Sequence, residues 1–257
     1  RQMCIRDSAY TAWWQKDSKL SAPKNSNLKT VMDFSFFDKI NTAKNEQTET
    51  WFKGLDRIYN NFVYDFLYPN PASVLAFIEN HDTDRFLGEG NNLPMLKQAS
   101  TLLLTTRRIP QLYYGTEVMM NGVKSKSDGY VRKDFPGGWT GDATNALTPA
   151  GRTKIQNECY DFYKTILNWR KGNDVIAKGS MVQFMVQNGV YAYARQYEGK
   201  TIFVMLNGTD AETTVPLKFY KEILKNSKQG KDILSGKAIT FGEELKMGPR
   251  ESLVIEL

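Results

Sequence analysis

The chain has 257 residues, of which 41% are apolar and 12% aromatic, enough to bury one large or two ordinary domain cores. The formal net charge is +6, but the 34 Lys and Arg residues are spread along the chain, which argues against nucleic acid as a partner. No stretch approaches the roughly 18 consecutive apolar residues of a membrane span.

The first eight residues, RQMCIRDS, show neither helical nor strand periodicity and contain no initiating Met. They resemble a translated sequencing-adapter scar, so we treat residues 1–8 as non-native and exclude them from the fold. The two cysteines, Cys4 and Cys159, lie far apart and have no metal-ligand or redox spacing. They therefore predict neither a disulfide framework nor a zinc site.

After residue 28, short runs rich in β-branched and aromatic residues alternate with longer runs of helical spacing, which predicts strands alternating with helices. The predicted strands are residues 31–34, 74–78 and 109–114, and a long Gly-rich and Lys-rich loop covers residues 121–148. The predicted helices have apolar residues three or four positions apart. These residues are Trp51, Leu55, Ile58 and Phe62; then Leu96, Ala99 and Leu103; and finally Ile155, Cys159, Phe162, Ile166 and Trp169.

From about residue 175, short strands are separated by turn signals such as Asn188-Gly189 and Glu198-Gly199, a pattern typical of successive β-hairpins. An all-β segment of this size can form a small sandwich. About three strand–helix units cannot close a parallel barrel by themselves. The barrel-like portion is therefore predicted to be incomplete.

The residues richest in chemistry follow the second predicted strand, where apolar residues pass directly into Glu79-Asn80-His81-Asp82-Thr83-Asp84-Arg85. In parallel α/β folds, functional sites form where strands end at this edge of the sheet. His81, the sole histidine, can hydrogen-bond a neutral polyol through its ring nitrogens. The alternative interpretation, a solvated polar turn, stays open on spacing alone.

The segment FIENHD matches the pattern Phe-x-x-Asn-His-Asp, and IPQLYYGTEV follows it at a fitting distance. The two motifs resemble the end of the seventh strand and the eighth strand of the α-amylase superfamily, glycoside hydrolase family 13. The wider match resembles its neopullulanase and cyclomaltodextrinase branch, particularly starch-utilisation enzymes of Bacteroides. The resemblance implies an α/β fold: the C-terminal part of a (β/α)8 barrel over residues 9–172, then a β-sandwich over residues 173–257.

The resemblance also implies retaining hydrolysis of α-glucosidic bonds in starch-derived α-glucans by two carboxylates, a nucleophile and an acid/base, which a third acid assists. By position, Asp82 is that third carboxylate, which stabilises the transition state, and His81 binds the sugar. The nucleophilic aspartate and acid glutamate of the family precede the segment that starts at Ala9. We therefore expect this chain to be inactive alone and to need the missing N-terminal half of the barrel.

Two further residues are candidates for substrate binding. Arg85 is expected either to reach a sugar hydroxyl or to pair with Asp82 or Asp84 and so orient the acid. Trp139, on the long loop after the third strand, can offer a flat indole to a glucose ring, although packing of the loop explains it equally well. A sugar-binding face formed by Tyr191 and its neighbours is a weaker alternative, because aromatic residues at period two usually form one side of a sandwich.

Two other functions remain open: a glucanosyltransferase of the same family, and a non-catalytic α-glucan-binding protein. No nucleotide-binding fingerprint is present, so we expect no cofactor in this chain. The resemblance allows calcium in the full-length protein but predicts no complete metal site here. It also implies a periplasmic or otherwise exported location.

Overall fold

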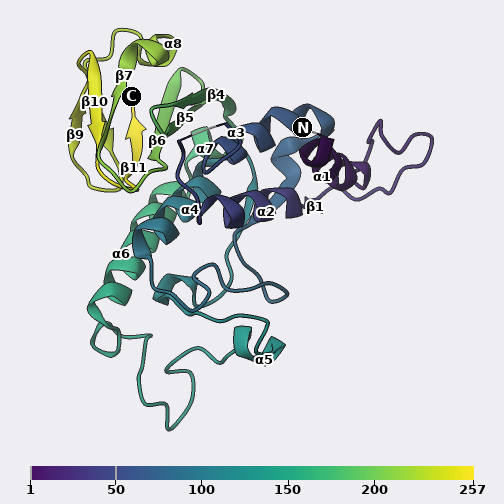
Figure 1. Ribbon diagram of the computed structural model, residues 1–257, viewed down its shortest axis with the longest axis vertical. Coiled ribbons are helices and arrows are strands. Elements are labelled where there is room, and N and C mark those ends of the chain that lie inside the picture. The colour runs from purple at the N-terminus through teal and green to yellow at the C-terminus, as the bar shows by residue number, and fades with distance from the viewer. Residues whose placement is uncertain (1, 50) are drawn as a thin grey trace.

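A computed structural model of the protein describes the backbone of residues 2–49 and 51–257 and the side chains of residues 7–49 and 51–257. Figure 1 shows helices and a short parallel sheet in the first two thirds of the chain, and antiparallel sheets in the last third. Within the described residues, no helix combines the length and the apolar character that a bilayer crossing requires.

The parallel sheet has the strand order β1-β2-β3, formed by β1 (Val31–Met32), β2 (Val74–Phe77) and β3 (Ile109–Gln111). Helices α2 (Phe34–Ala43) and α3 (Asp56–Val63), with the 3-10 turns η1 (Tyr64–Leu67) and η2 (Pro71–Ser73), connect β1 to β2. Helix α4 (Leu93–Thr105) connects β2 to β3. The three predicted strands are thus present and parallel.

The third strand ends earlier than the sequence predicts. Gly115 adopts φ +83° and begins the 3-10 turn η3 (Thr116–Val118), so the chain leaves the sheet after Gln111. Two elements between β1 and β2 also differ from the prediction. Helix α2 was missed, since Asp33 ends the first strand by capping this helix through a 2.9 Å bond from the Phe36 amide. Trp51, predicted to begin a helical face, lies in a turn before α3 and is 70% exposed.

Helix α1 (Gln2–Trp13) covers most of the residues that were predicted to lack periodicity. Its buried Ala12 packs against Val31, Tyr68 and Val74. Asp7 lies 3.2 Å from the ammonium of Lys39 on α2. The helix therefore packs onto the start of the parallel sheet, while the side chain of Cys4 lies outside the described ones.

The loop after β3 contains one turn of helix, α5 (Asp128–Val131), and the 3-10 turn η4 (Pro149–Gly151). Helix α6 (Lys154–Arg170) follows, and its buried positions include Cys159, Phe162 and Ile166, as predicted. Thr153 and Gln156 form a capping box at its start, and the chain turns at Gly172 with φ +77°. The short helix α7 (Asp174–Lys178) leads into the antiparallel sheets.

The C-terminal part contains a six-stranded sheet with the order β4-β5-β6-β11-β8-β9 and a two-stranded sheet of β7 and β10. The turns Asn188-Gly189 and Glu198-Gly199 have positive φ at both residues and join β4, β5 and β6 as consecutive hairpins, which confirms their prediction. The bounds are β4 (Ser180–Gln187), β5 (Val190–Tyr197), β6 (Lys200–Asn207), β7 (Thr213–Pro216), η5 (Leu217–Tyr220), α8 (Lys221–Leu224), β8 (Gln229–Asp232), β9 (Ala238–Thr240), β10 (Glu244–Met247) and β11 (Ser252–Glu256).

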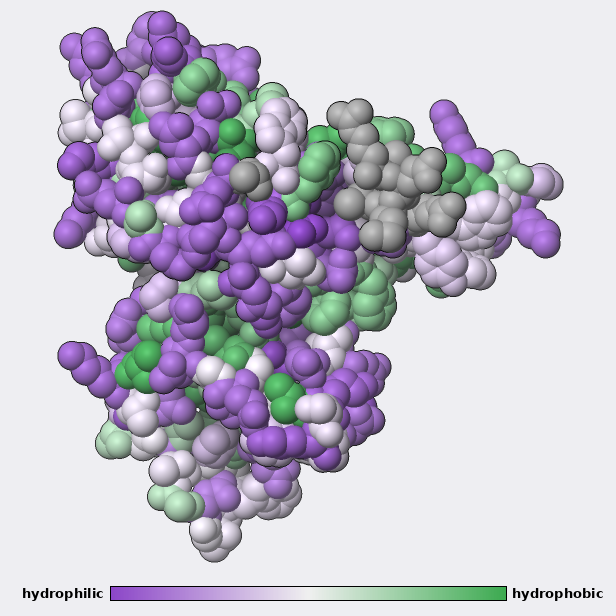
Figure 2. Space-filling view, viewed as in Figure 1, coloured by the Kyte–Doolittle hydropathy of each residue, from purple (hydrophilic) through white to green (hydrophobic). Residues whose placement is uncertain are grey.

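The six-stranded sheet is buried on both faces. On β5, Ala192 and Ala194 join a core with residues of the smaller sheet, such as Val215 and Met247. Tyr191 and Tyr193 point to the opposite face and join the core of the helical part. Both tyrosines are fully buried, which excludes the sugar-binding face that their alternation allowed. Figure 2 accordingly shows mostly hydrophilic residues over the C-terminal sheets, and apolar residues gathered lower on the same face.

A buried ionic cluster joins the parallel strands to the segment after α3. Arg108, next to β3, donates from Nε to Asp33 over 3.1 Å and from Nη1 to Asp65 over 3.1 Å. Its neighbour Arg107, which is part-exposed, also donates to Asp65 over 2.6 Å. Burial raises the pKa of Asp33 even though Arg108 opposes that shift. The cluster therefore links the end of β1 to the start of β3.

Candidate active-site turn

The turn that follows β2 is shaped by its own side chains. Asn80 accepts a 2.8 Å hydrogen bond from the Asp82 amide, and Thr83 Oγ1 accepts one of 2.9 Å from the Asn80 amide. These short-range bonds compete with continuation of the strand. The chain therefore reverses, with Phe77 and Ile78 buried below the turn and His81 and Asp82 at its tip.

His81 and Asp82 are brought together at the surface. Their side chains are each 61% exposed, and His81 Nε2 lies 3.2 Å from Asp82 Oδ2. An imidazole and a carboxylate side by side offer hydrogen-bond donors and acceptors that match the hydroxyl groups of a sugar. The turn is thus solvated, and its exposure leaves both side chains accessible to a ligand.

Arg132 contacts both residues of this pair, and the sequence did not predict it. Its Nε donates to the His81 carbonyl over 2.9 Å, and its Nη2 lies 3.0 Å from Asp82 Oδ1. Lys124 adds a 2.9 Å bond from Nζ to the Asp82 carbonyl. Both residues come from the loop after β3, so the basic residues of that loop were the available signal.

Arg85 does not lie beside His81 and Asp82. Its guanidinium is fully buried, 3.3 Å from Glu79 and 2.6 Å from the Tyr114 carbonyl, and stacks 3.9 Å from the centre of the Tyr113 ring. The predicted pairing with Asp82 or Asp84 is therefore replaced by one with Glu79, because the turn directs Arg85 inward. A guanidinium without exposed surface cannot contact a sugar, so the structure corrects the substrate-binding role and leaves Arg85 supporting the turn.

The rings of Tyr113 and Tyr114 lie on one side of the chain and contact each other edge-on, with 4.7 Å between their centres. The alternation of a strand, which would place neighbouring side chains on opposite faces, does not apply to them because β3 has already ended at Gln111. The Tyr114 hydroxyl donates to the Lys133 carbonyl over 2.6 Å and so ties this segment to the long loop.

Glu79 is a buried carboxyl group below the turn. Its side chain is 2% exposed, and burial raises its pKa, although hydrogen bonds from Thr116 and the Phe86 amide and the charge of Arg85 oppose that shift. A carboxyl so enclosed cannot reach a substrate. Glu79 therefore cannot serve with Asp82 as a pair of catalytic carboxylates.

The raised pKa of Glu79 predicts how stability depends on pH. Between the ordinary glutamate value of 4.5 and the higher value in the folded chain, the folded state keeps a proton that the unfolded state has released. The contribution of Glu79 to the free energy of unfolding should therefore fall as the pH rises from 4.5. Urea unfolding at several pH values checks this, and Glu79→Gln should show a smaller fall. Equal slopes for both proteins would contradict it.

Trp139 lies on the long loop between α5 and α6, at the bottom of Figure 1, and its side chain is 68% exposed. Its backbone amide donates to Asp142 over 3.1 Å, as does the Gly137 amide over 2.7 Å. The loop is thus organised around Asp142, and the indole is not packed beneath it. An exposed ring can stack on a ligand.

The described residues include no group of three or more His, Cys, Asp or Glu side chains placed to hold a metal ion. Cys159 is buried and free, and burial raises its pKa to about 12, so its thiol is not a nucleophile near neutral pH. The exposed ionisable side chains of the turn itself are the imidazole of His81 and the carboxylates of Asp82 and Asp84.

Comparison with known proteins shows the family of the chain. Residues 181–256 match the cyclo-malto-dextrinase C-terminal domain. The chain is 29% identical over 226 residues to an α-amylase of Niallia circulans, covering 85% of the chain and 38% of that enzyme. It is 30% identical over 233 residues to a cyclomaltodextrin glucanotransferase of Thermoanaerobacterium thermosulfurigenes, covering 88% of the chain and 29% of that enzyme.

The same relationship holds for the fold. The structure of an Anoxybacillus α-amylase superposes on 97% of this chain with a TM-score of 0.74 and 20% identity, and the match covers 50% of that enzyme. The α-amylase of Geobacillus thermoleovorans gives a TM-score of 0.73 with the same coverage. The chain spans half or less of the length of each of these relatives. It is therefore a homologue of the α-amylases and cyclomaltodextrin glucanotransferases of glycoside hydrolase family 13, with a cyclo-malto-dextrinase C-terminal domain.

Proposed function

We propose that this chain belongs to an enzyme that cleaves α-glucosidic bonds in starch-derived α-glucans with retention of configuration, and that Asp82 and His81 bind the sugar at the bond that is broken. The observation that carries the proposal is the exposed pair of His81 and Asp82 at the end of β2, within a motif that resembles the family signature. Their physical role follows from their charge and position.

Asp82 would act by binding and not by bond making. A carboxylate that accepts hydrogen bonds from ring hydroxyls favours a distorted sugar ring, and its negative charge stabilises an oxocarbenium-like transition state. The imidazole of His81 donates to a hydroxyl of the same sugar. Arg132, 3.0 Å from Asp82 Oδ1, keeps the carboxylate oriented until substrate hydroxyls replace part of that contact.

The nucleophile and the acid/base would come from the rest of the protein. Retaining hydrolysis needs two carboxyl groups about 5 to 5.5 Å apart across the scissile bond. Glu79 is buried, and Asp82 already faces His81 and Arg132. We therefore propose that the 257-residue chain alone does not turn over substrate.

The two outer strands of the parallel sheet have edges with which further strands can pair. Among the described residues, β1 and β3 each pair with β2 only, so each has a free edge. Apolar side chains along this sheet are exposed: Phe34 by 52%, Ile109 by 41% and Leu112 by 38%. Free strand edges and exposed apolar side chains are costly in water. The proposal is that these strands are the last part of a (β/α)8 barrel whose N-terminal half is the partner of this chain.

Substrate preference is proposed from the relatives. The match to a cyclo-malto-dextrinase C-terminal domain supports a cyclomaltodextrinase type of enzyme acting on cyclodextrin. A neopullulanase type, with pullulan or maltooligosaccharides as substrates, rests on the resemblance of the motifs alone. The glucanotransferase from Thermoanaerobacterium supports a second candidate, transfer of a glucosyl chain to another sugar. An exported location and calcium held elsewhere in the protein are parts of the proposal that rest on the resemblance alone.

Product analysis on the protein that includes the N-terminal half of the barrel tests this function. Incubation with maltoheptaose should give shorter maltooligosaccharides whose new reducing ends are α anomers by NMR, as retention requires. Longer oligosaccharides in excess would favour the transferase. Absence of any cleavage would overturn the enzymatic proposal and favour a protein that only binds glucans.

A further inference from the structure

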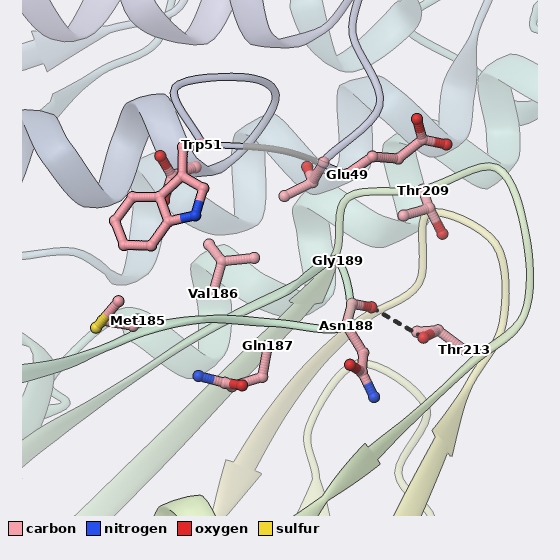
Figure 3. A pocket seen from close by; sticks show the side chains of 11 residues that line it. Glu49, Trp51, Met185, Val186, Gln187, Asn188, Gly189, Thr209 and Thr213 are labelled. Atoms are coloured by element: carbon pink, nitrogen blue, oxygen red, sulfur yellow. Dashed lines mark hydrogen bonds between the residues drawn. The ribbon is translucent and has the colours of Figure 1, made fainter.

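A hollow of ≈ 620 Å³ lies where the loop between α2 and α3 meets the turn between β4 and β5. Figure 3 shows Trp51 and Glu49 on the loop side, with Val186, Gln187 and Asn188 on the hairpin side. Its volume is in the range of ligand pockets, roughly 300 to 1,000 Å³. None of the described residues that line it belongs to the turn of His81 and Asp82.

Trp51 supplies a large unpaired ring at this hollow. The indole is 70% exposed, and Figure 3 shows it above Val186 with Met185 nearby. Met185 is itself 48% exposed. The pairing of β4 with β5 shifts register between Phe184 and Gln187, so Met185 and Val186 sit in a β-bulge. Bulges redirect side chains, and here Met185 is exposed at the hollow while Val186 lines it and also packs against the core of the helical part.

The rim of the hollow contains side chains that can hydrogen-bond the hydroxyl groups of a ligand. The amide of Gln187 makes no side-chain hydrogen bond to any described residue and can both donate and accept. Asp56 contributes a buried carboxylate that already accepts a 2.6 Å bond from the Phe52 amide, and Glu49 contributes an exposed one. These two negatively charged groups repel an anionic ligand. A neutral ligand that has hydroxyl groups and an apolar face fits both the ring and the rim.

The two sides of the hollow are held firmly together. The Thr48 amide donates to the Gly208 carbonyl over 3.0 Å, and Arg250 donates to the Glu46 carbonyl over 3.2 Å. At Gly208, a Cβ would lie 2.0 Å from Thr48 Oγ1, so the close approach requires glycine there. On the hairpin side, Thr213 donates to the Asn188 carbonyl over 2.9 Å. Such preorganisation lowers the entropy that a ligand loses on binding.

We propose that this hollow is a second carbohydrate-binding site, separate from the turn of His81 and Asp82, in which a glucosyl ring stacks on Trp51 and the rim binds its hydroxyls. The choice of an α-linked glucan as ligand rests on the proposed function. The described residues that line the site all belong to this chain. Binding there therefore requires neither the N-terminal half of a barrel nor catalytic turnover.

Titration of the 257-residue chain with maltoheptaose, followed by calorimetry and by the tryptophan indole NMR signals, tests the proposal. Trp51→Ala should weaken binding at least about tenfold. The matched control Phe66→Ala removes another exposed ring, 76% exposed on η1, and should leave the affinity unchanged. Asp82→Asn, titrated in parallel, reports separately on binding at the turn of His81 and Asp82.

The outcomes separate this site from the proposed active site. No binding of maltoheptaose by the chain, or equal affinity for Trp51→Ala, would overturn the second site. Loss of binding in Asp82→Asn with none in Trp51→Ala would overturn it too, while supporting the proposed function. Equal affinity for cellohexaose, a β-linked glucan, would show that the hollow is not selective for α-glucans and would refute the assigned ligand class.

Discussion

Asp82→Asn should lower kcat of the protein that includes the N-terminal barrel half by about 10³-fold, equivalent to about 4 kcal/mol of transition-state stabilisation. The amide keeps the shape of the side chain but loses the negative charge that would face the developing positive charge on the sugar. Because the side chain is 61% exposed, the change should have little effect on stability. Steady-state kinetics with maltoheptaose and a urea unfolding curve measure the two effects.

Asp84→Asn is the matched control for this change. Asp84 is exposed on the same turn, and its Oδ1 accepts a 2.6 Å hydrogen bond from the Lys124 amide, which an asparagine oxygen can also accept. Its kcat should stay within about threefold of the unmodified protein. Equal losses in the two variants would mean that the turn as a whole, and not the carboxylate of Asp82, supports catalysis.

Arg108→Met should lower the free energy of unfolding by about 3 to 5 kcal/mol, because it leaves the buried carboxylate of Asp33 without its cation and Asp65 with only the part-exposed Arg107. Arg108 has no exposed side-chain surface, and its partners Asp33 and Asp65 are 0% and 5% exposed. Methionine fills much of the same volume, so the loss reports on charge more than on packing. Urea denaturation of the 257-residue chain measures it.

Arg107→Met provides the comparison, since Arg107 is adjacent and binds the same Asp65 oxygen over 2.6 Å, but its side chain is 31% exposed. Water replaces a part-exposed partner more easily, so the expected loss is about 1 kcal/mol or less. Similar losses of stability for the two variants would contradict the claim that the buried guanidinium of Arg108 links β1 to β3.

The sequence predicted those elements whose signal is local. The helical face of α6 and the hairpin turns at Asn188 and Glu198 appear as expected, because apolar spacing and turn chemistry act over a few residues. Helix α2 was missed because its start depends on the Asp33 cap, which ends β1 after two residues. The residues predicted as a strand, 31–34, include the capping residue Asp33, and its capping of α2 ends the strand after Met32.

For the candidate site, the sequence predicted the position of the turn but not the side chains that hold it in place. His81 and Asp82 are neighbours in the chain, so their proximity is local. The inward path of Arg85 and the approach of Arg132 depend on a loop some fifty positions later, which only tertiary packing places. Long-range contacts between side chains leave no periodic signal in a single sequence.

The most direct test of the account measures turnover of maltoheptaose by the 257-residue chain alone and by the same chain mixed with a separately expressed N-terminal barrel half. The account predicts no turnover by either piece alone and measurable turnover by the mixture, which Asp82→Asn should remove. Turnover by the isolated chain, or a mixture whose activity survives Asp82→Asn, would contradict the claim that this turn completes a cleavage site shared with the rest of the protein.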